Sequence, residues 1–377
     1  MELASIFAAM VKEDASDLFL KVGVPPAMRV VGRVISMGGN PLTEENMLEM
    51  FNEVCDDFAK KKFAEKGEVD VSYEIYGVGR FRANIFRQRG YIGMVFRHIH
   101  SKIPTMEELN LPAEQLRRLA LLPRGLVLVT GTAGSGKSTT IASMINYVNE
   151  TEERHIISVE DPIEFTFTDQ KCVIDQREVG QDTDSFVSAL KHAVRQSPDV
   201  IFIGEMRDIE TMEAAINAAE TGHLVFSTLH SLNAMQTVDR IINFFPPHHH
   251  PFLQMQLAQL LEGVVSQRLL PTKDGTARMP SIELMCSTPT VQELLLHGKT
   301  RELYKALKDG SYYGCMTFNQ SLKSLLERDL ITLEDALAAA DSPDELKLEL
   351  RGISKDANRS FNANTGGGGG GSRGPRR

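Results

Sequence analysis

The sequence predicts an α/β protein with a covered parallel sheet, preceded by a smaller α+β domain and followed by helices. Two observations carry this prediction. From about residue 124 onward, short apolar runs alternate with stretches of helical periodicity, as expected of a parallel sheet with helices on both faces. Before residue 100, strand-like runs follow one another without helices between them, which indicates an antiparallel sheet.

The first domain is predicted over residues 1–100. Apolar residues at helical spacing predict helices at 1–12 and 45–61. Runs rich in β-branched and aromatic residues predict strands at 69–77, 79–89 and 91–99. Two prolines and the lack of a strand signal mark a connector after this domain, so we place a linker at 101–123.

The second domain is predicted as a core over 124–250 and a mainly helical part over 251–351. In the core, strands are expected at 125–131, 155–161, 200–205 and 223–230, and helices at 137–150, 185–196 and 210–222. Residues 352–377 contain a run of glycines and a basic end, with too little apolar content to fold. We expect this segment to be a disordered tail.

Composition narrows the class of protein. A chain of 377 residues with 42% hydrophobic residues is long enough for two domains with cores of their own. The net charge of −9 argues mildly against a nucleic-acid-binding protein, whose interface is usually basic. Four scattered cysteines without a CxxC pair indicate free thiols and not disulfides or zinc ligands.

The chain is expected to be cytoplasmic. No apolar run approaches the ~18 residues of a membrane-spanning helix. The N-terminal segment lacks the basic lead, apolar core and cleavage site of a signal peptide.

The segment GTAGSGKST, residues 131–139, fits the phosphate-binding pattern G-x-x-x-x-G-K-[ST] directly after a predicted strand and before a predicted helix. Such a loop presents backbone N–H groups and a helix N-terminus to phosphate. A chance match in a glycine- and serine-rich turn is much less favoured, because strand, motif and helix occur together. We predict ATP binding, with Lys137 at the β- and γ-phosphates and Ser138 as a Mg²⁺ ligand. The predicted nucleotide-binding residues of this loop are Thr132, Ala133, Gly134, Ser135, Gly136, Lys137, Ser138 and Thr139.

The carboxyl ends of parallel strands bring further side chains toward such a loop. The apolar run 200–203 is followed by a single carboxylate, Glu205, where many P-loop enzymes carry two. A second carboxylate must then come from another strand, and the segment VEDPIEF offers Glu160, Asp161 and Glu164. Turn capping and a solvated loop are the alternative roles for these acids. His230 closes the strand that begins at 223.

Four segments in this order, GTAGSGKSTT, ISVEDPIEF, DVIFIGEMRD and TGHLVFSTLH, resemble the Walker A, Asp, atypical Walker B and His boxes of the secretion and type IV pilus ATPase family. The resemblance spans roughly residues 1–350. It implies a RecA-like P-loop ATPase domain after a PAS-like N-terminal domain, Mg²⁺-dependent ATP hydrolysis, and a homohexameric ring.

The resemblance also implies roles for single residues. Glu164 matches the water-activating glutamate, and Glu205 matches the residue that helps to hold Mg²⁺ and its waters. His223 and His230 match a pair that senses or positions phosphate. Because seven residues separate the two histidines, we expect His230, at the strand tip, to be the direct neighbour of the nucleotide. The predicted catalytic set is therefore Glu164, Glu205, Lys137 and His230, with Glu160 and His223 as further nucleotide-binding residues.

Arginines are concentrated outside the P-loop domain, at positions 80, 82, 87, 89 and 97. Composition alone is equally consistent with a half-solvated pair of strands with a basic face. Members of the family place arginines from this region at the nucleotide, and Arg82 and Arg97 are the residues that align. The three histidines at 248–250 lack a carboxylate or cysteine partner nearby, so a solvated turn is favoured over a metal site.

The module before the P-loop is only about 120 residues long and no four-cysteine zinc element is present, which resembles the compact retraction motors of the PilT/PilU family. The segment 315–350 resembles the PilU branch, and TVQELLLHGKT, residues 290–300, departs from the helical motif of the PilT branch. The resemblance implies an accessory motor for type IV pilus retraction and twitching motility. Its partners would be another retraction ATPase and the inner-membrane pilus platform protein, at the inner face of the cytoplasmic membrane.

Three alternatives remain open. The first is an ATPase for pilus extension or type II secretion assembly. The second, a RecA-like nucleic-acid motor, is disfavoured by the acidic balance of the chain. The third is a scaffold that binds ATP without hydrolysing it, which the presence of Lys137, Ser138, Glu164 and Glu205 disfavours.

Overall fold

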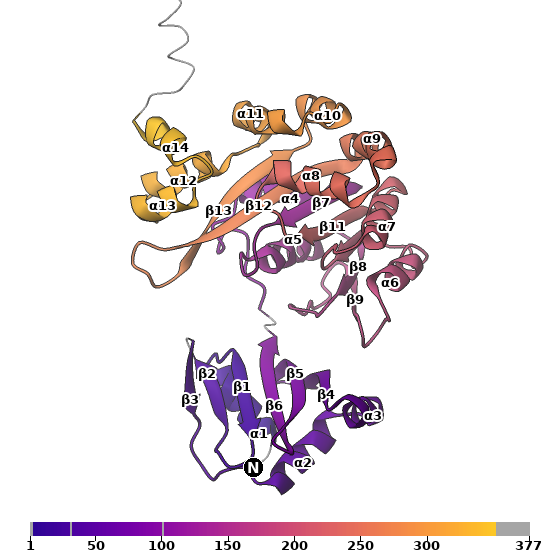
Figure 1. Ribbon diagram of the computed structural model, residues 1–377, viewed down its shortest axis with the longest axis vertical. Helices are drawn as coiled ribbons and strands as arrows, with labels where there is room; N and C mark the ends of the chain where they lie inside the picture. Colours follow the sequence, from indigo (N-terminus) through magenta and orange to yellow (C-terminus); the bar gives the residue numbers. More distant parts are fainter. Residues whose placement is uncertain (1–2, 31, 100–101, 352–377) are drawn as a thin grey trace, which may run out of the picture. The chain divides into compact units, whose positions relative to one another are not determined.

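A computed structural model describes residues 3–30, 32–99 and 102–351 (Figure 1). The described residues form two compact units. The first contains the chain up to Pro104 together with Asn149–Ala193, and the second contains Thr105–Val148 together with the described residues from Val194 onward. The first segment ends at Pro104, and the sequence predicts a domain boundary at residue 100. The segment Asn149–Ala193, however, was predicted to belong wholly to the second domain.

The N-terminal sheet has the strand order β3-β2-β1-β6-β5-β4, and all neighbouring strands are antiparallel. The predicted strands correspond to β4, β5 and β6, while β1, β2 and β3 were not predicted. These three strands are four or five residues long, which is too short for a clear alternation of apolar and polar residues. The bounds are β1 (Asp17–Lys21), β2 (Ala27–Val30), β3 (Arg33–Ser36), β4 (Glu68–Ile75), β5 (Gly79–Gln88) and β6 (Tyr91–Ile99).

Helices α1 (Leu3–Lys12), α2 (Glu44–Val54) and α3 (Asp57–Lys66) belong to this part of the chain. The helix predicted over 45–61 is divided at Asp56, because the side chain of this residue accepts the Ala59 N–H and caps α3. Phe7 of α1 lies in the core, with its ring centroid 4.2 Å from that of Phe81 and 4.9 Å from that of Phe96.

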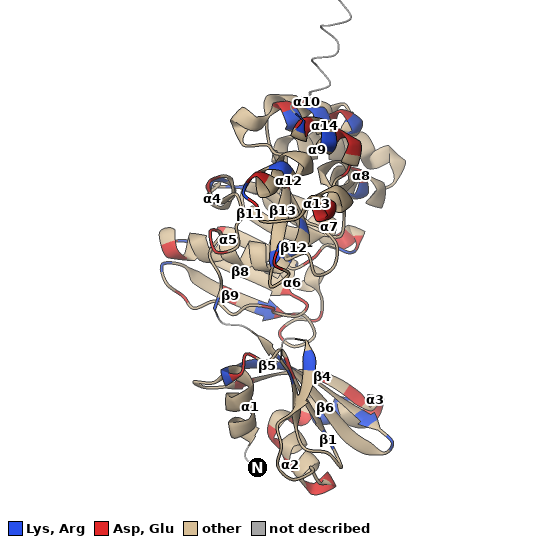
Figure 2. Cartoon of the chain, turned by 90° about the vertical axis from the view of Figure 1, so that its left-hand side faces the viewer, with Lys and Arg blue, Asp and Glu red and all other residues tan. Residues whose placement is uncertain are grey.

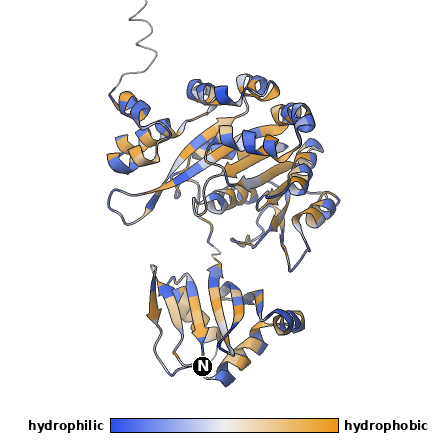
Figure 3. Cartoon of the chain, viewed as in Figure 1, coloured by the Kyte–Doolittle hydropathy of each residue, from blue (hydrophilic) through white to orange (hydrophobic). Residues whose placement is uncertain are grey.

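The second sheet has the order β13-β12-β7-β11-β10-β8-β9. Parallel pairing joins β7 to β11 and β12, β10 to β11, and β8 to β9, whereas β13 runs antiparallel to β12. Strands β7 and β11 are buried along their whole length, and both are coloured as hydrophobic in Figure 3. The bounds are β7 (Gly125–Thr130), β8 (His155–Glu160), β9 (Val173–Glu178), β10 (Val200–Ile203), β11 (Leu224–Leu229), β12 (Leu261–Pro271) and β13 (Arg278–Cys286).

Helices connect these strands, and Figure 2 shows that the helices carry both basic residues (Lys and Arg) and acidic residues (Asp and Glu). The helix α4, which lies within the predicted linker 101–123, has buried leucines at Leu116 and Leu119. The bounds are α4 (Ala113–Ala120), α5 (Lys137–Thr151), α6 (Phe186–Ala193), α7 (Ile209–Glu220), α8 (Ala234–Phe244) and α9 (His250–Leu260). None of the helices in the described ranges is long and apolar enough to cross a membrane.

Helices make up most of the segment 251–351, but the segment also contains a strand hairpin that the sequence did not predict. It contributes the strands β12 and β13 before its remaining helices. Because β12 lies between two other strands and is largely buried, its residues lack the alternation that identifies a half-exposed strand. The helices that follow are α10 (Pro289–Leu296), α11 (Leu303–Asp309), α12 (Phe318–Glu327), α13 (Leu333–Ala339) and α14 (Pro343–Leu350).

The last three of these helices pack beside the β12–β13 hairpin (Figure 1). Leu322 and Leu325 of α12, together with Leu346 of α14, form an apolar cluster with Leu270 and Met279 of the hairpin. The predicted disordered tail, 352–377, lies outside the described residues.

Candidate functional site

The phosphate-binding loop lies between β7 and α5, as predicted. It can close only if glycine occupies two of its positions. A Cβ atom at Gly131 would lie 2.4 Å from the Ser135 Oγ and 2.5 Å from the Gln267 carbonyl oxygen. Gly136 has a φ of +88°, and a Cβ atom there would lie 2.9 Å from the Gln267 side-chain nitrogen. Glycine is therefore required at both ends of the loop.

The polar groups of this loop fit a bound phosphate chain. The Lys137 ammonium donates to the carbonyl oxygens of Gly131, at 3.0 Å, and Thr132, at 2.9 Å. The Ser135 hydroxyl is buried and has no hydrogen-bond partner within the described chain. Since a buried hydroxyl without a partner is costly, a phosphate oxygen in the loop would satisfy it.

Glu205 and His230 lie together at the carboxyl ends of neighbouring strands. Their strands, β10 and β11, pair in parallel register, and the His230 Nε2 lies 3.6 Å from the Glu205 Oε2. The backbone after β10 is fixed by the Thr228 hydroxyl, which donates to the Gly204 carbonyl oxygen at 2.7 Å. Glu205 also forms an ion pair with Arg207.

The His230 imidazole has a pKa below its ordinary value of 6.5. Burial is the main cause, and the positive charge of Lys137 is the second. The carboxylate of Glu205 acts in the opposite direction, while the charges of Arg240 and Arg207 lower the pKa further. The imidazole is therefore neutral at neutral pH. His230 shares the edge of the sheet with the phosphate-binding loop, because β11 and β7 are parallel neighbours and both segments follow the carboxyl ends of these strands.

His223 lies at the opposite end of β11 from His230. Its Nδ1 atom is 2.9 Å from the Ala218 carbonyl oxygen and 3.2 Å from the Thr221 Oγ1, near the end of α7. A strand of six residues spans about 20 Å. The structure therefore does not bring His223 to the phosphate-binding loop, which corrects the predicted contact. The physical reason is that the amino end of a parallel strand lies at the edge away from the ligand.

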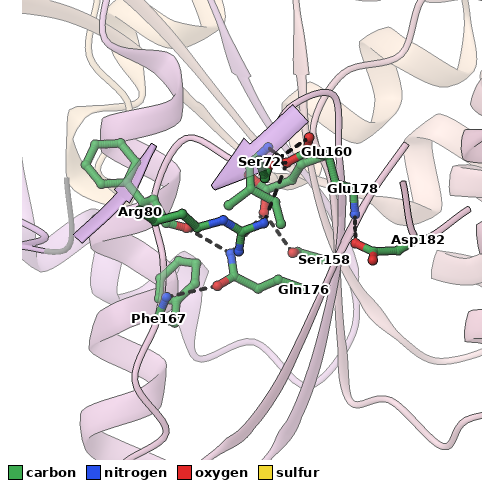
Figure 4. Close-up of polar contacts among 10 residues, drawn as sticks. Ser72, Arg80, Ser158, Glu160, Phe167, Gln176, Glu178 and Asp182 are labelled. Atoms are coloured by element: carbon green, nitrogen blue, oxygen red, sulfur yellow. Dashed lines mark hydrogen bonds and ion pairs between the residues drawn. The ribbon is translucent and has the colours of Figure 1, made fainter. Parts of the chain in front are cut away.

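Glu160, the last residue of β8, is buried within the first unit. Its carboxylate accepts hydrogen bonds from the Ser158 hydroxyl at 2.7 Å and from the Gln176 amide at 3.3 Å (Figure 4). Burial raises the pKa of Glu160 to about 7, although these hydrogen bonds oppose the shift. Its contact with a nucleotide remains a prediction.

The loop that carries Glu164 is held on both sides of this residue by β9. On one side, Glu178 accepts the Ile163 N–H at 3.3 Å. On the other side, the Gln176 amide donates to the Phe165 carbonyl oxygen at 2.8 Å and accepts the Phe167 N–H at 2.9 Å (Figure 4). The Glu164 side chain itself is exposed.

Sequence reasoning missed β9 and the two polar residues, Gln176 and Glu178, that point from it toward the loop. The residue types carry no clear strand signal, because positions 175–178 are four consecutive polar residues, Asp175, Gln176, Arg177 and Glu178. Nothing in the residue types alone indicates what the two polar side chains bind.

The two arginines predicted to serve the nucleotide, Arg82 and Arg97, are directly opposite each other on β5 and β6. Each has a carboxylate partner in the N-terminal sheet. Arg97 binds Asp17, with both nitrogen-to-oxygen distances at 3.1 Å, and Arg82 lies 3.9 Å from Asp70. The carboxylates of Asp17 and Asp70 thus offset the electrostatic repulsion between the two guanidinium groups. The Arg97 side chain is 71% exposed.

Within the described residues, no group of three or more His, Cys, Asp or Glu side chains could hold a metal ion. The predicted Mg²⁺ site needs no such group, because Mg²⁺ in phosphate-transferring enzymes binds to one or two protein ligands, waters and the phosphates. Ser138 opens α5 at the phosphate-binding loop, and Glu205 lies at the same edge of the sheet as His230. Both fit this chemistry and remain the predicted ligands.

Comparison with known proteins gives a consistent result. The family model for the type II/IV secretion system protein matches residues 94–329. The chain is 46% identical over 358 residues to the type IV pilus ATPase PilU of Pseudomonas aeruginosa, covering 95% of this chain and 94% of that protein. It is 43% identical over 344 residues to the type IV pilus retraction ATPase PilT of the same organism, covering 91% and 99%.

The fold is also similar to a solved structure. The crystal structure of the pilus retraction motor PilT with bound ADP aligns with a TM-score of 0.86 at 42% identity, and the match covers 92% of this chain and 99% of that one.

Proposed function

The chain belongs to the type II/IV secretion system protein family and is an ATPase, and we propose that its ATP hydrolysis powers the retraction of type IV pili. The observation that carries this proposal is the similarity to PilU and PilT over nearly the full length of all three chains. The closed phosphate-binding loop with its unsatisfied Ser135 hydroxyl supports nucleotide binding by this chain.

The proposed reaction is in-line attack of water on the γ-phosphate, with ADP as the leaving group. Lys137 and the backbone N–H groups of the loop bind the phosphates, and Glu164 orients the water and accepts its proton. Mg²⁺, held by Ser138 and assisted by Glu205, would neutralise charge on the phosphates. The exposed Glu164 side chain on a fixed backbone supports its role.

His230 is the proposed sensor of the γ-phosphate. Its neutral imidazole keeps one N–H, which can donate a hydrogen bond to a phosphate oxygen, while the other ring nitrogen is an acceptor. The neighbouring Glu205 carboxylate fixes the other side of the same site. Arg82 and Arg97 would add positive charge at the transferring phosphoryl group, and both can exchange their carboxylate partners for phosphate.

We further propose a homohexameric ring that acts as a PilU-like accessory motor at the inner face of the cytoplasmic membrane. It would work with a partner retraction ATPase and the inner-membrane pilus platform protein. The sequence of 290–300 supports the accessory role, since it departs from the helical motif expected of a stand-alone retraction motor.

The proposal is tested by replacing Lys137 with Ala in a piliated host and counting surface pili and retraction events. More pili with weak or absent retraction are expected, whereas Lys191→Ala, at an exposed position on α6, should behave as wild type. Bald cells would instead indicate an extension or assembly motor. Because an accessory motor can be masked by its partner, the same variant is examined with and without the partner ATPase. Normal pili in both backgrounds would refute the proposal.

A further inference from the structure

Strand β9 carries a buried carboxylate whose partners come from two distant segments of the first unit. Glu178 is 6% exposed. It accepts the Ile163 N–H at 3.3 Å, and it accepts the Ser72 hydroxyl at 3.3 and 3.4 Å to its two oxygens. Arg80 lies 3.8 Å from the same carboxylate. Ser72 and Arg80, which belong to β4 and β5 of the N-terminal sheet, lie beside Glu178 in Figure 4. Ile163 directly precedes Glu164 in the sequence.

Two hydrogen bonds with Asp182 fix the backbone of Glu178. The Glu178 N–H donates to the Asp182 carboxylate at 2.7 Å, and the Asp182 N–H donates to the Glu178 carbonyl oxygen at 2.9 Å. A buried carboxylate is tolerated only when it is paired and hydrogen-bonded. The contacts with Ser72, Arg80 and Ile163 therefore form a connected set, in which the loss of one partner weakens the placement of the others.

We propose that Glu178 is a positioning residue that holds the backbone beside Glu164 and links it to the N-terminal sheet through Ser72 and Arg80. This inference rests on the proposed role of Glu164 in orienting water. Gln176 holds the loop after Glu164, so the loss of Glu178 alone would release the loop on one side and let the Glu164 carboxylate swing about the other.

The consequence for catalysis is a loss of alignment and not a loss of nucleotide binding. A displacement of the catalytic group by about 1 Å can cost on the order of a hundredfold in rate. The phosphate-binding loop has its own hydrogen bonds and does not depend on Glu178. We therefore expect Glu178→Ala to lower kcat about tenfold or more while changing the KM for ATP by less than about threefold.

Conservative and peripheral variants separate this role from general folding. Glu178→Gln keeps an oxygen acceptor for the Ile163 N–H, and its kcat should remain within about threefold of wild type. Ser72→Ala removes only the hydroxyl from the N-terminal sheet and should lower kcat in the same direction as Glu178→Ala, but less. Asp175→Ala is the matched control, because Asp175 lies on the other face of β9 and binds His155 at 3.0 Å. Its kcat should equal that of wild type.

The experiment measures phosphate release by the full chain at saturating ATP and Mg²⁺, together with amide hydrogen exchange of the peptide covering 161–168. Faster exchange there in Glu178→Ala and Ser72→Ala, but not in Asp175→Ala, is expected. In a Glu164→Gln background, Glu178→Ala should cause no further loss, because it acts through Glu164. A wild-type kcat in folded Glu178→Ala, or an equal further loss in the Glu164→Gln background, would overturn the inference. Wild-type turnover in Glu164→Gln would instead refute the proposed role of Glu164, on which this inference rests, and would leave the proposed function to the Lys137→Ala test.

Discussion

The imidazole of His230 and the carboxylate of Glu205 lie 3.6 Å apart, although 24 residues of chain separate the strand positions that carry them. The pair exists because β10 and β11 are parallel neighbours and both end at the same edge of the sheet. Glu205, a predicted Mg²⁺ ligand, and His230, the proposed phosphate sensor, therefore lie close enough to interact electrostatically. The negative charge of Glu205 raises the pKa of His230, against the larger effects that lower it.

The titration of His230 tests this coupling. In the protein without nucleotide, we expect its pKa, followed by NMR, to lie below the ordinary value of 6.5. Lys137→Ala should raise this pKa, because it removes a positive charge that disfavours the imidazolium. Glu205→Gln should lower it further, because it removes the charge that favours the imidazolium. A His230 pKa that responds to neither substitution would show that the three side chains do not share one site.

The phosphate-binding loop should not tolerate a Cβ atom at Gly136. Gly136→Ala forces a residue with a side chain to a φ of +88° and places its Cβ 2.9 Å from the Gln267 side-chain nitrogen. We expect the affinity for a fluorescent ADP analogue to fall by about tenfold or more, since a small shift of the loop misaligns several N–H groups. Gly275→Ala is the control, because its φ is +70° but nothing lies near its Cβ. Equal affinity in the two variants would contradict the importance of the close contact.

Burial of Glu160 makes the stability of the chain depend on pH. Its pKa rises from 4.5 in the unfolded chain to about 7 in the folded one, so the folded state binds more protons between these values. The stability that this proton contributes is fully present below pH 4.5 and is lost as the pH rises through 7. The loss amounts to about 3 kcal/mol.

Glu160→Gln removes this titration while keeping a side chain of the same size. The Tm of the variant relative to wild type should therefore rise between about pH 5 and about pH 8, as measured by thermal unfolding in parallel buffers. A constant difference over this range would show that the Glu160 carboxylate does not stay protonated in the folded protein.

Much of the architecture could be predicted from local pattern. The α/β fold, membership in the ATPase family and ATPase activity are confirmed, because each rests on signals contained in short segments such as the phosphate-binding loop. The preference for His230 over His223 as the nucleotide neighbour stays a prediction, and it agrees with the positions of the two residues at opposite ends of the six-residue strand β11.

The parts that were missed depend on contacts between distant segments. Strand β12 was taken for helix because burial between two other strands removes its alternation. The carboxylate of Glu178 gives no signal of its own, because its partners Ser72 and Ile163 lie 106 and 15 residues away in the chain. Hydrogen bonds between such distant residues cannot be predicted until the fold that brings the segments together is known.

The measurement that tests the account most directly is ATP turnover by Glu164→Gln. The substitution keeps the size of the side chain but removes the carboxylate that we propose orients water and accepts its proton. We expect turnover to fall by about a hundredfold or more, while the affinity for an ADP analogue changes by less than about threefold. Glu153→Gln, which alters an exposed carboxylate before β8, serves as the control and should retain full activity. Wild-type turnover in Glu164→Gln would show that another group activates the water, and the proposed mechanism would be wrong.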